Sequence, residues 1–202
     1  MRLLPATLFL LLSAAPAWAI SGDDLIAAAR DGMDDDLAGL LKRHADVKAR
    51  DDTGATALHW AVMGRNAAQA AMLLKAHADP NAADANGVTP LMLAIGAGDA
   101  DCVRLLLAAG ADPGRARPDG ETPLMSAVWT GSADIVQQLL ARKVDVNARE
   151  TRFQQTALMW AAGYPQITRL LLAAGADVHA TTKSWETLTT NYTPVVSTIG
   201  NT

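Results

Sequence analysis

Residues 87–95 read G-V-T-P-L-M-L-A-I, and closely similar stretches occur one period before and one period after them. Residues 54–62 read G-A-T-A-L-H-W-A-V, and residues 120–128 read G-E-T-P-L-M-S-A-V. The leading glycine of each stretch therefore lies 33 residues after the previous one. A fixed period of this length is typical of stacked repeats, in which each unit buries its apolar face against its neighbours. The period predicts a solenoid.

Residues 84–116 show how one unit is built. D-A-N-G at 84–87 is a turn signal, and T-P at 89–90 is a helix start, because threonine caps free amide groups and proline is tolerated at the first helical position. Gly98 is expected to end this first helix, and Gly110 to end a second one in the left-handed conformation. Apolar residues spaced for one helix face predict the core, namely Leu91, Ala94, Ile95, Cys102, Val103, Leu106 and Leu107.

This turn–helix–helix pattern resembles the ankyrin repeat. The resemblance is carried by the T-P-L-x-x-A start of the first helix, the L-L pair of the second and the A-G-A-D at its end. It implies an all-α solenoid of about five helix-turn-helix repeats with short β-turn tips, over residues 20–180. The units are expected at about 21–50, 51–83, 84–116, 117–149 and 150–180. Within the family pattern, His59 is expected to be a hydrogen-bonded structural residue.

The two flanking units depart from the pattern. The first lacks the turn, and Asp23 stands where the capping threonine is expected, which predicts a solvent-facing terminal cap. The last has one extra residue before Thr156, so that Phe153 falls where the turn glycine is expected.

Residues 181–202 are rich in Thr, Ser and Asn, and three interpretations remain open: an irregular end, a segment that covers the last repeat, or the start of a long loop in a longer repeat protein.

Three residues replace the glycine that ends the second helix, namely His44, His77 and Lys143. A non-glycine residue in the left-handed conformation costs on the order of 1 kcal/mol. His44 and His77 lie one repeat apart, but no third ligand accompanies them, so we expect no metal site and no cofactor. Cys102 occupies a buried position, where we expect a small core side chain rather than a reactive thiol.

The first 19 residues have the pattern of a secretory signal peptide. A short basic start is followed by an apolar run, and Ala17-Trp18-Ala19 forms a small-x-small cleavage site. An uncleaved membrane anchor is the competing interpretation, and the cleavage motif and the prolines in the run argue against it. We expect cleavage after Ala19 and a periplasmic or secreted protein of bacterial type.

The composition narrows the class of partner. A formal net charge of −4 argues against a nucleic-acid partner, and no later apolar run approaches membrane-spanning length. The sequence has no Gly-rich phosphate loop, no H-E-x-x-H and no nucleophile elbow. We therefore expect a monomeric, non-catalytic module that binds another protein; an enzyme with an unrecognised site is the less favoured alternative.

In the ankyrin family, partners usually contact the turn tips and the exposed side of the first helix, which line a concave face. The resemblance implies partner-binding residues at Asp52, Thr53, Met63, Asn86, Asp119, Glu121, Trp129, Arg152 and Gln154. Trp129 matches Met63 and Gly96 in the preceding units, so the core does not require a large ring there. Two interpretations stay open: an exposed binding residue, or packing against Met63, Phe153 or a neighbouring repeat. Trp60 and Trp160 match Leu93 and are expected to pack between repeats.

Narrower versions of this function are an inhibitor or immunity protein for a periplasmic enzyme, or an accessory factor for one, for example in peroxide stress. A purely structural domain of a longer chain is a third possibility. The residues themselves do not choose among these.

Overall fold

The computed structural model describes residues 21–183, and the expected signal peptide and most of the 181–202 tail lie outside them. This part of the chain forms ten helices and no strand, so the predicted all-α solenoid is confirmed. The helices are α1 (Gly22–Arg30), α2 (Asp34–Lys42), α3 (Ala57–Met63), α4 (Ala67–Lys75), α5 (Pro90–Gly96), α6 (Ala100–Ala108), α7 (Pro123–Trp129), α8 (Ala133–Leu140), α9 (Ala157–Trp160) and α10 (Pro165–Ala173).

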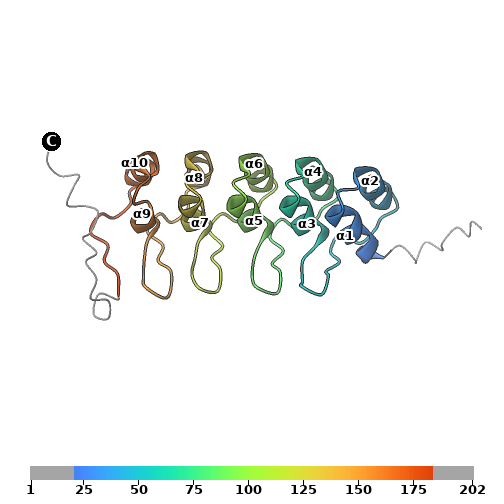
Figure 1. The fold of residues 1–202 in the computed structure, drawn as a ribbon, viewed down its shortest axis with the longest axis horizontal. Coiled ribbons are helices and arrows are strands. Elements are labelled where there is room, and N and C mark those ends of the chain that lie inside the picture. Colours follow the sequence, from blue (N-terminus) through green and yellow to red (C-terminus); the bar gives the residue numbers. More distant parts are fainter. Residues whose placement is uncertain (1–20, 184–202) are drawn as a thin grey trace, which may run out of the picture.

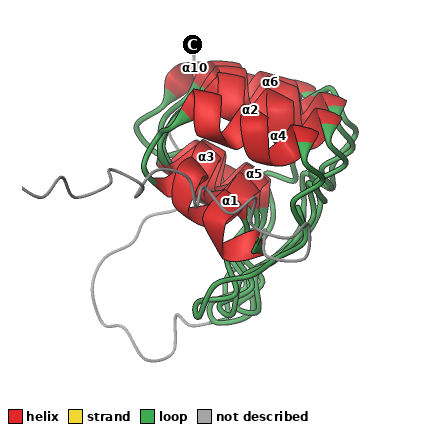
Figure 2. Ribbon diagram, turned by 90° about the vertical axis from the view of Figure 1, so that its right-hand side faces the viewer, coloured by secondary structure: helices red, strands yellow, loops and turns green. Residues whose placement is uncertain are grey.

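The helices stack as five pairs in chain order (Figure 1). The first helices of the pairs form one layer and the second helices another, and each helix contacts its counterpart in the next unit. The turns between units project together beyond the first-helix layer (Figure 2). We call the exposed side of the first helices, together with these turns, the first-helix face.

Each turn is held by side-chain and backbone hydrogen bonds. The Asp84 carboxylate accepts from the backbone N–H groups of Asn86 and Val88, both at 2.8 Å, and Gly87 has a positive φ of 78°. Adjacent turns are joined as well, because the Ala85 N–H donates to the Thr53 carbonyl at 2.9 Å. Glycine is required at position 54, where an added Cβ would lie 2.9 Å from the Ala85 backbone nitrogen. The same bond joins the Thr151 N–H to the Asp119 carbonyl at 2.9 Å, whereas Pro118, which has no N–H, interrupts the series between the third and fourth units.

The start of the first unit differs from the prediction. Ser21, and not Asp23, is the N-cap of α1: its hydroxyl accepts from the Asp23 N–H at 2.8 Å, while the Asp24 carboxylate accepts from the Ser21 N–H at 3.3 Å. The reciprocal capping box satisfies two free amide groups, and Asp23 takes a place in the acidic first turn of the helix.

The turn of the fifth unit also differs. Gln154, and not Phe153, takes the left-handed position, with φ 59°, because the extra residue is absorbed before it. Glu150 is long enough to span the enlarged turn, and its carboxylate accepts from the N–H groups of Arg152, Phe153 and Gln155 at 2.6, 2.7 and 2.9 Å. The first helix that follows, α9, is only 4 residues long.

A single apolar core runs between the two helix layers through all five units. All seven core residues predicted for the unit 84–116 are buried, Cys102 among them. His59 is also buried and bonds to Thr56 through Nδ1 and to the Val88 carbonyl of the next unit through Nε2. Its structural role is confirmed. The largest fully buried side chains are those of Leu25, Leu37, Leu58, Leu73, Leu91, Ile95, Leu106, Leu124, Met125, Ile135, Leu139 and Ile167.

Candidate functional site

Two positions of the first helices lie on the first-helix face. The inner position lies four residues after the N-cap threonine and is held by Trp60, Leu93, Ser126 and Trp160 in units two to five. The outer position lies at the helix end and recurs every 33 residues, as Arg30, Met63, Gly96 and Trp129 in units one to four.

At both ends of the array, the outer residue of one unit meets the inner residue of the next. The Arg30 guanidinium lies over the Trp60 ring, 4.3 Å from its centroid. Trp129 meets Trp160 edge to face, with ring centroids 6.3 Å apart and an interplanar angle of 72°. The outer and inner positions therefore form a contacting pair at the first and last boundaries between units.

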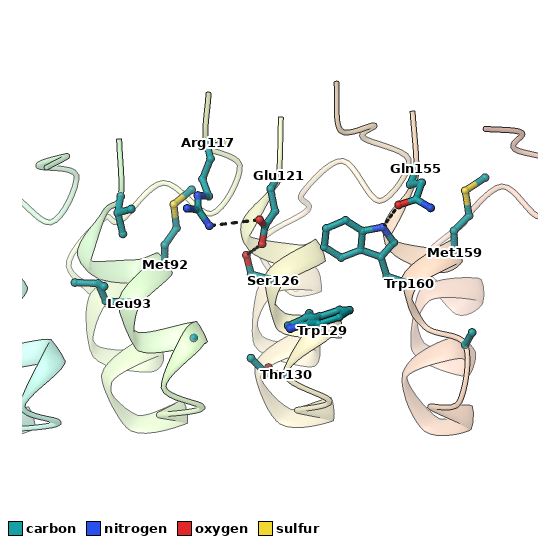
Figure 3. Close-up of a pocket in the computed structure, with 13 residues that line it drawn as sticks. Met92, Leu93, Arg117, Glu121, Ser126, Trp129, Thr130, Gln155, Met159 and Trp160 are labelled. Carbon is teal, nitrogen blue, oxygen red and sulfur yellow. Dashed lines mark hydrogen bonds and ion pairs between the residues drawn. The ribbon is translucent and has the colours of Figure 1, made fainter. Parts of the chain in front are cut away.

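The pair at the boundary between units three and four is Gly96 and Ser126, and both are small. A Cβ added at Gly96 would find no atom within 4 Å, so the space in front of it is open. An open groove of about 910 Å³ runs over this hollow and past Trp129 (Figure 3). Its lining comes from α5, α7, α9 and the residues just before and after these helices: Val88, Met92, Leu93, Gly96, Arg117, Glu121, Ser126, Trp129, Thr130, Gln155, Met159, Trp160 and Ala162.

A polar cluster lies beside the hollow. The Ser126 hydroxyl donates to one oxygen of the Glu121 carboxylate, and Arg117 Nη1 donates to the other at 3.4 Å. Arg117 stands where Asp51 and Asp84 hold the turns of earlier units, and here the Asp119 carboxylate accepts the Glu121 N–H at 3.1 Å instead. The Arg117 backbone still bonds within the turn, but its side chain takes no part in it and lines the groove.

The two tryptophans border the other side of the groove. Trp160 is half-buried, and its indole N–H donates to the Gln155 side chain at 2.9 Å. Trp129 is 75% exposed, far more than any other large apolar side chain of the described residues. Both interpretations of Trp129 are therefore correct in part. Most of its side chain is exposed, and its ring also packs against a neighbouring repeat, through Trp160 rather than Met63 or Phe153.

The residues expected to bind a partner fall into three groups. Glu121 and Trp129 line the groove. Asp52, Asn86, Asp119 and Arg152 are exposed on the turn tips, and Met63 is 53% exposed two units before Trp129. Thr53 is exposed, but its hydroxyl donates to Asp51 at 2.6 Å, and Gln154 is committed to its turn through a bond to the Glu150 carbonyl at 3.1 Å.

Arg117, Ser126 and Gln155 were not among the expected site residues, although the sequence contains a signal for the first two. When units two to four are aligned by their period, the fourth unit differs at four positions among others. Arg117 replaces an Asp, Glu121 replaces Ala or Val, Ser126 replaces Trp or Leu, and Trp129 replaces Met or Gly. All four substituted positions, Arg117, Glu121, Ser126 and Trp129, line the same groove.

Comparison with protein families agrees with this architecture. The sequence model for ankyrin repeats (three copies) matches residues 25–117 and 109–182, and the chain therefore belongs to the ankyrin-repeat family. Ankyrin repeats are generally protein–protein interaction modules and are typically non-enzymatic. A search of curated proteins finds no match to the chain.

Two further observations concern only residues 21–183. None of their helices has the length and apolar character needed to cross a membrane. The same part of the chain contains no group of three or more His, Cys, Asp or Glu residues placed to hold a metal ion.

Proposed function

We propose that this protein binds a protein partner on its first-helix face, the concave face of the family, with the groove between Gly96 and Trp160 at the centre of the contact. Partner side chains fill the hollow at Gly96 and Ser126, and Trp129 projects beside it into the interface. Large, exposed aromatic side chains at the centre of a face are the residues that most often carry binding energy.

The observation that carries this proposal is the concentration of departures in the fourth unit. Its four substitutions leave the buried core positions alone, since Leu124, Ala127 and Val128 remain fully buried. They lie on the groove side of the unit, and with Gly96 of the third unit they give an open hollow, an ion pair and an exposed tryptophan. Binding of a partner explains changes that are confined to the groove side, because packing of the buried core does not require them.

We further propose that the contact is made in the bacterial envelope, after cleavage at Ala19. The signal-peptide pattern of residues 1–19 supports this location. The partner is then an envelope protein, and inhibition or support of a periplasmic enzyme, for example in peroxide stress, remains the narrower form of the proposal. Fractionation of cells and determination of the mature N-terminus test the location separately.

Site-specific photo-crosslinking tests the binding face. A photoreactive residue at Thr130, which is exposed and lines the groove, is compared with one at Arg104, which is exposed on α6 in the other helix layer. The proposal expects one protein of the envelope to be captured from position 130 and not from position 104. Equal capture from both positions, or capture from neither, contradicts it.

A further inference from the structure

The first boundary of the array shows how a cation binds on this face. The Arg30 guanidinium covers the Trp60 ring at 4.3 Å and lies 3.3 Å from the Asp51 carboxylate. The same carboxylate accepts the Trp60 indole N–H at 2.7 Å. One tryptophan at the inner position and one carboxylate from the turn before it thus hold an arginine that projects from the outer position of the preceding unit. Cation–π contact and charge pairing act together there.

The boundary between units four and five has a tryptophan at the inner position as well, but no arginine at the outer position. Trp160 stands at the same inner position as Trp60, and its indole N–H is again held by a turn side chain, Gln155. The outer position is Trp129, which adds a second aromatic ring at 72° to the first. Within residues 21–183, the guanidinium groups over aromatic rings are those of Arg30 and Arg152, and Arg152 lies over Phe153.

A carboxylate completes the set. Glu121 lines the groove together with both tryptophans, and it stands between Arg117 on one side and Trp160 and Trp129 on the other (Figure 3). Its bond to Arg117 is long, at 3.4 Å, and its side chain keeps 21% exposure. A positive group that enters on the tryptophan side therefore approaches Glu121 from the side opposite Arg117.

We propose that the groove recognises a cationic side chain of the protein partner, an arginine or a lysine, which lies against Trp129 and Trp160 and pairs with Glu121. This inference rests on the proposed function and names the chemistry of the partner. The exposed surface of Trp129 supplies the ring for cation–π contact, and the hollow at Gly96 and Ser126 gives room for the stem of a long side chain.

The opposite choice, an acidic partner side chain paired with Arg117, is less well supported by the surroundings. Residues 21–183 carry 20 Asp and Glu against 16 Lys and Arg, a net charge of −4, so the domain as a whole attracts a basic partner. The chain's own Arg30–Trp60 contact shows that the inner tryptophan position accepts a guanidinium. An acidic group would gain nothing from the negative faces of the two rings.

Peptide selection tests the proposal without a known partner. A library of random linear peptides is selected on the immobilised purified protein, and the enriched peptides are then synthesised and titrated against four forms of it. These are the wild type, Trp129→Leu, Glu121→Gln, and Met63→Leu as a control at the same outer position two units earlier. Leucine keeps an apolar side chain but removes the aromatic ring.

The expected result is a shared Arg or Lys in the enriched peptides. Its replacement by glutamine weakens binding to the wild type by about tenfold, and has little effect on binding to Trp129→Leu. Glu121→Gln weakens binding of the basic peptide as well, while Met63→Leu binds it as the wild type does.

Two other results overturn the proposal in different ways. If the enriched peptides lack a basic residue but bind Trp129→Leu more weakly than the wild type, the groove is the binding site and recognition of a cation is excluded. If the peptides bind Trp129→Leu as tightly as the wild type, or if the selection enriches none, both the cation site and the proposed function of the groove are excluded.

Discussion

Lys143, just after helix α8, has the same left-handed backbone conformation that Gly110 adopts one unit earlier. The φ angles are 56° for Lys143 and 91° for Gly110, and His44 and His77 occupy this position in the first two units with 61° and 64°. The left-handed conformation costs little for glycine, whereas a side chain with a Cβ is strained there. Among residues 21–183, three of the five second-helix ends therefore carry this strain.

We expect Lys143→Gly to raise the free energy of unfolding by about 1 kcal/mol, reduced by the conformational entropy that glycine adds to the unfolded chain. Urea denaturation followed by circular dichroism measures it. Gly110→Ala is the matched control and should lower the midpoint, since the space around its Cβ is open and only the backbone strain is added. A midpoint for Lys143→Gly at or below that of the wild type would show that the lysine stabilises the helix end by another contact.

His59 gives the fold a dependence on pH. Burial lowers the pKa of His59 below its usual 6.5, although its bond to the Val88 carbonyl acts in the opposite direction. The Thr56 backbone N–H donates to Nδ1 at 3.1 Å, so Nδ1 is an acceptor and the proton lies on Nε2, which donates to Val88 at 3.2 Å. A proton on Nδ1 would point at the Thr56 backbone N–H, so that two hydrogen-bond donors would face each other without an acceptor.

The sign of the effect follows from the lowered pKa. Between pH 6.5 and the lower pKa of the folded state, the unfolded chain binds the proton and the folded protein does not, so the stability falls as the pH falls. We expect the free energy of unfolding of the wild type to decrease between pH 7 and pH 5, above the range in which most carboxylates titrate. His59→Gln should be less stable at pH 7 and show a flatter profile. Parallel profiles for the two proteins would rule out His59 as the source.

The repeat pattern predicted the parts of the structure that depend on local sequence. Turn glycines, capping threonines and the apolar faces of the helices recur in the second to fourth units, and the left-handed Lys143 followed from its register with Gly110. Register alone was insufficient where the chain length changed. The extra residue of the fifth unit could be absorbed on either side of the turn, and counting forward gave Phe153, whereas hydrogen bonding to Glu150 places Gln154 in the left-handed conformation.

The site was predicted only in part, for a different reason. Trp129 could be identified as an exposed residue because its counterparts, Met63 and Gly96, are smaller. Its contact with Trp160 depends on how far one unit is offset from the next, and no single unit contains that information. Arg117 was overlooked because its position usually supplies a turn carboxylate, and only the structure shows that Asp119 takes over that bond.

Cys102 should be inert in the folded protein. It is fully buried in α6, and burial together with its hydrogen bond to Asp99 raises the pKa of the thiol to about 12. Since the thiolate is the reactive form, we expect modification by iodoacetamide at pH 8 only through unfolding. The rate in the native protein should rise with urea in parallel with the unfolding transition. Rapid modification in buffer alone, without loss of helical signal, would contradict this.

Trp129 and Trp160 touch each other, yet their removal should affect the protein in opposite ways. Trp160 is half-buried against the core and bonded to Gln155, so that Trp160→Ala should cost about 3 kcal/mol of unfolding free energy. Trp129 is 75% exposed and loses only the edge-to-face contact, for which we expect at most about 1 kcal/mol. Urea titrations of both variants measure the difference, and capture of the partner by crosslinking from position 130 measures binding. Trp129→Ala should abolish capture while it leaves the fold nearly as stable as before. A loss of stability as large as that of Trp160→Ala would show that Trp129 belongs to the packing of the array and not to its binding face.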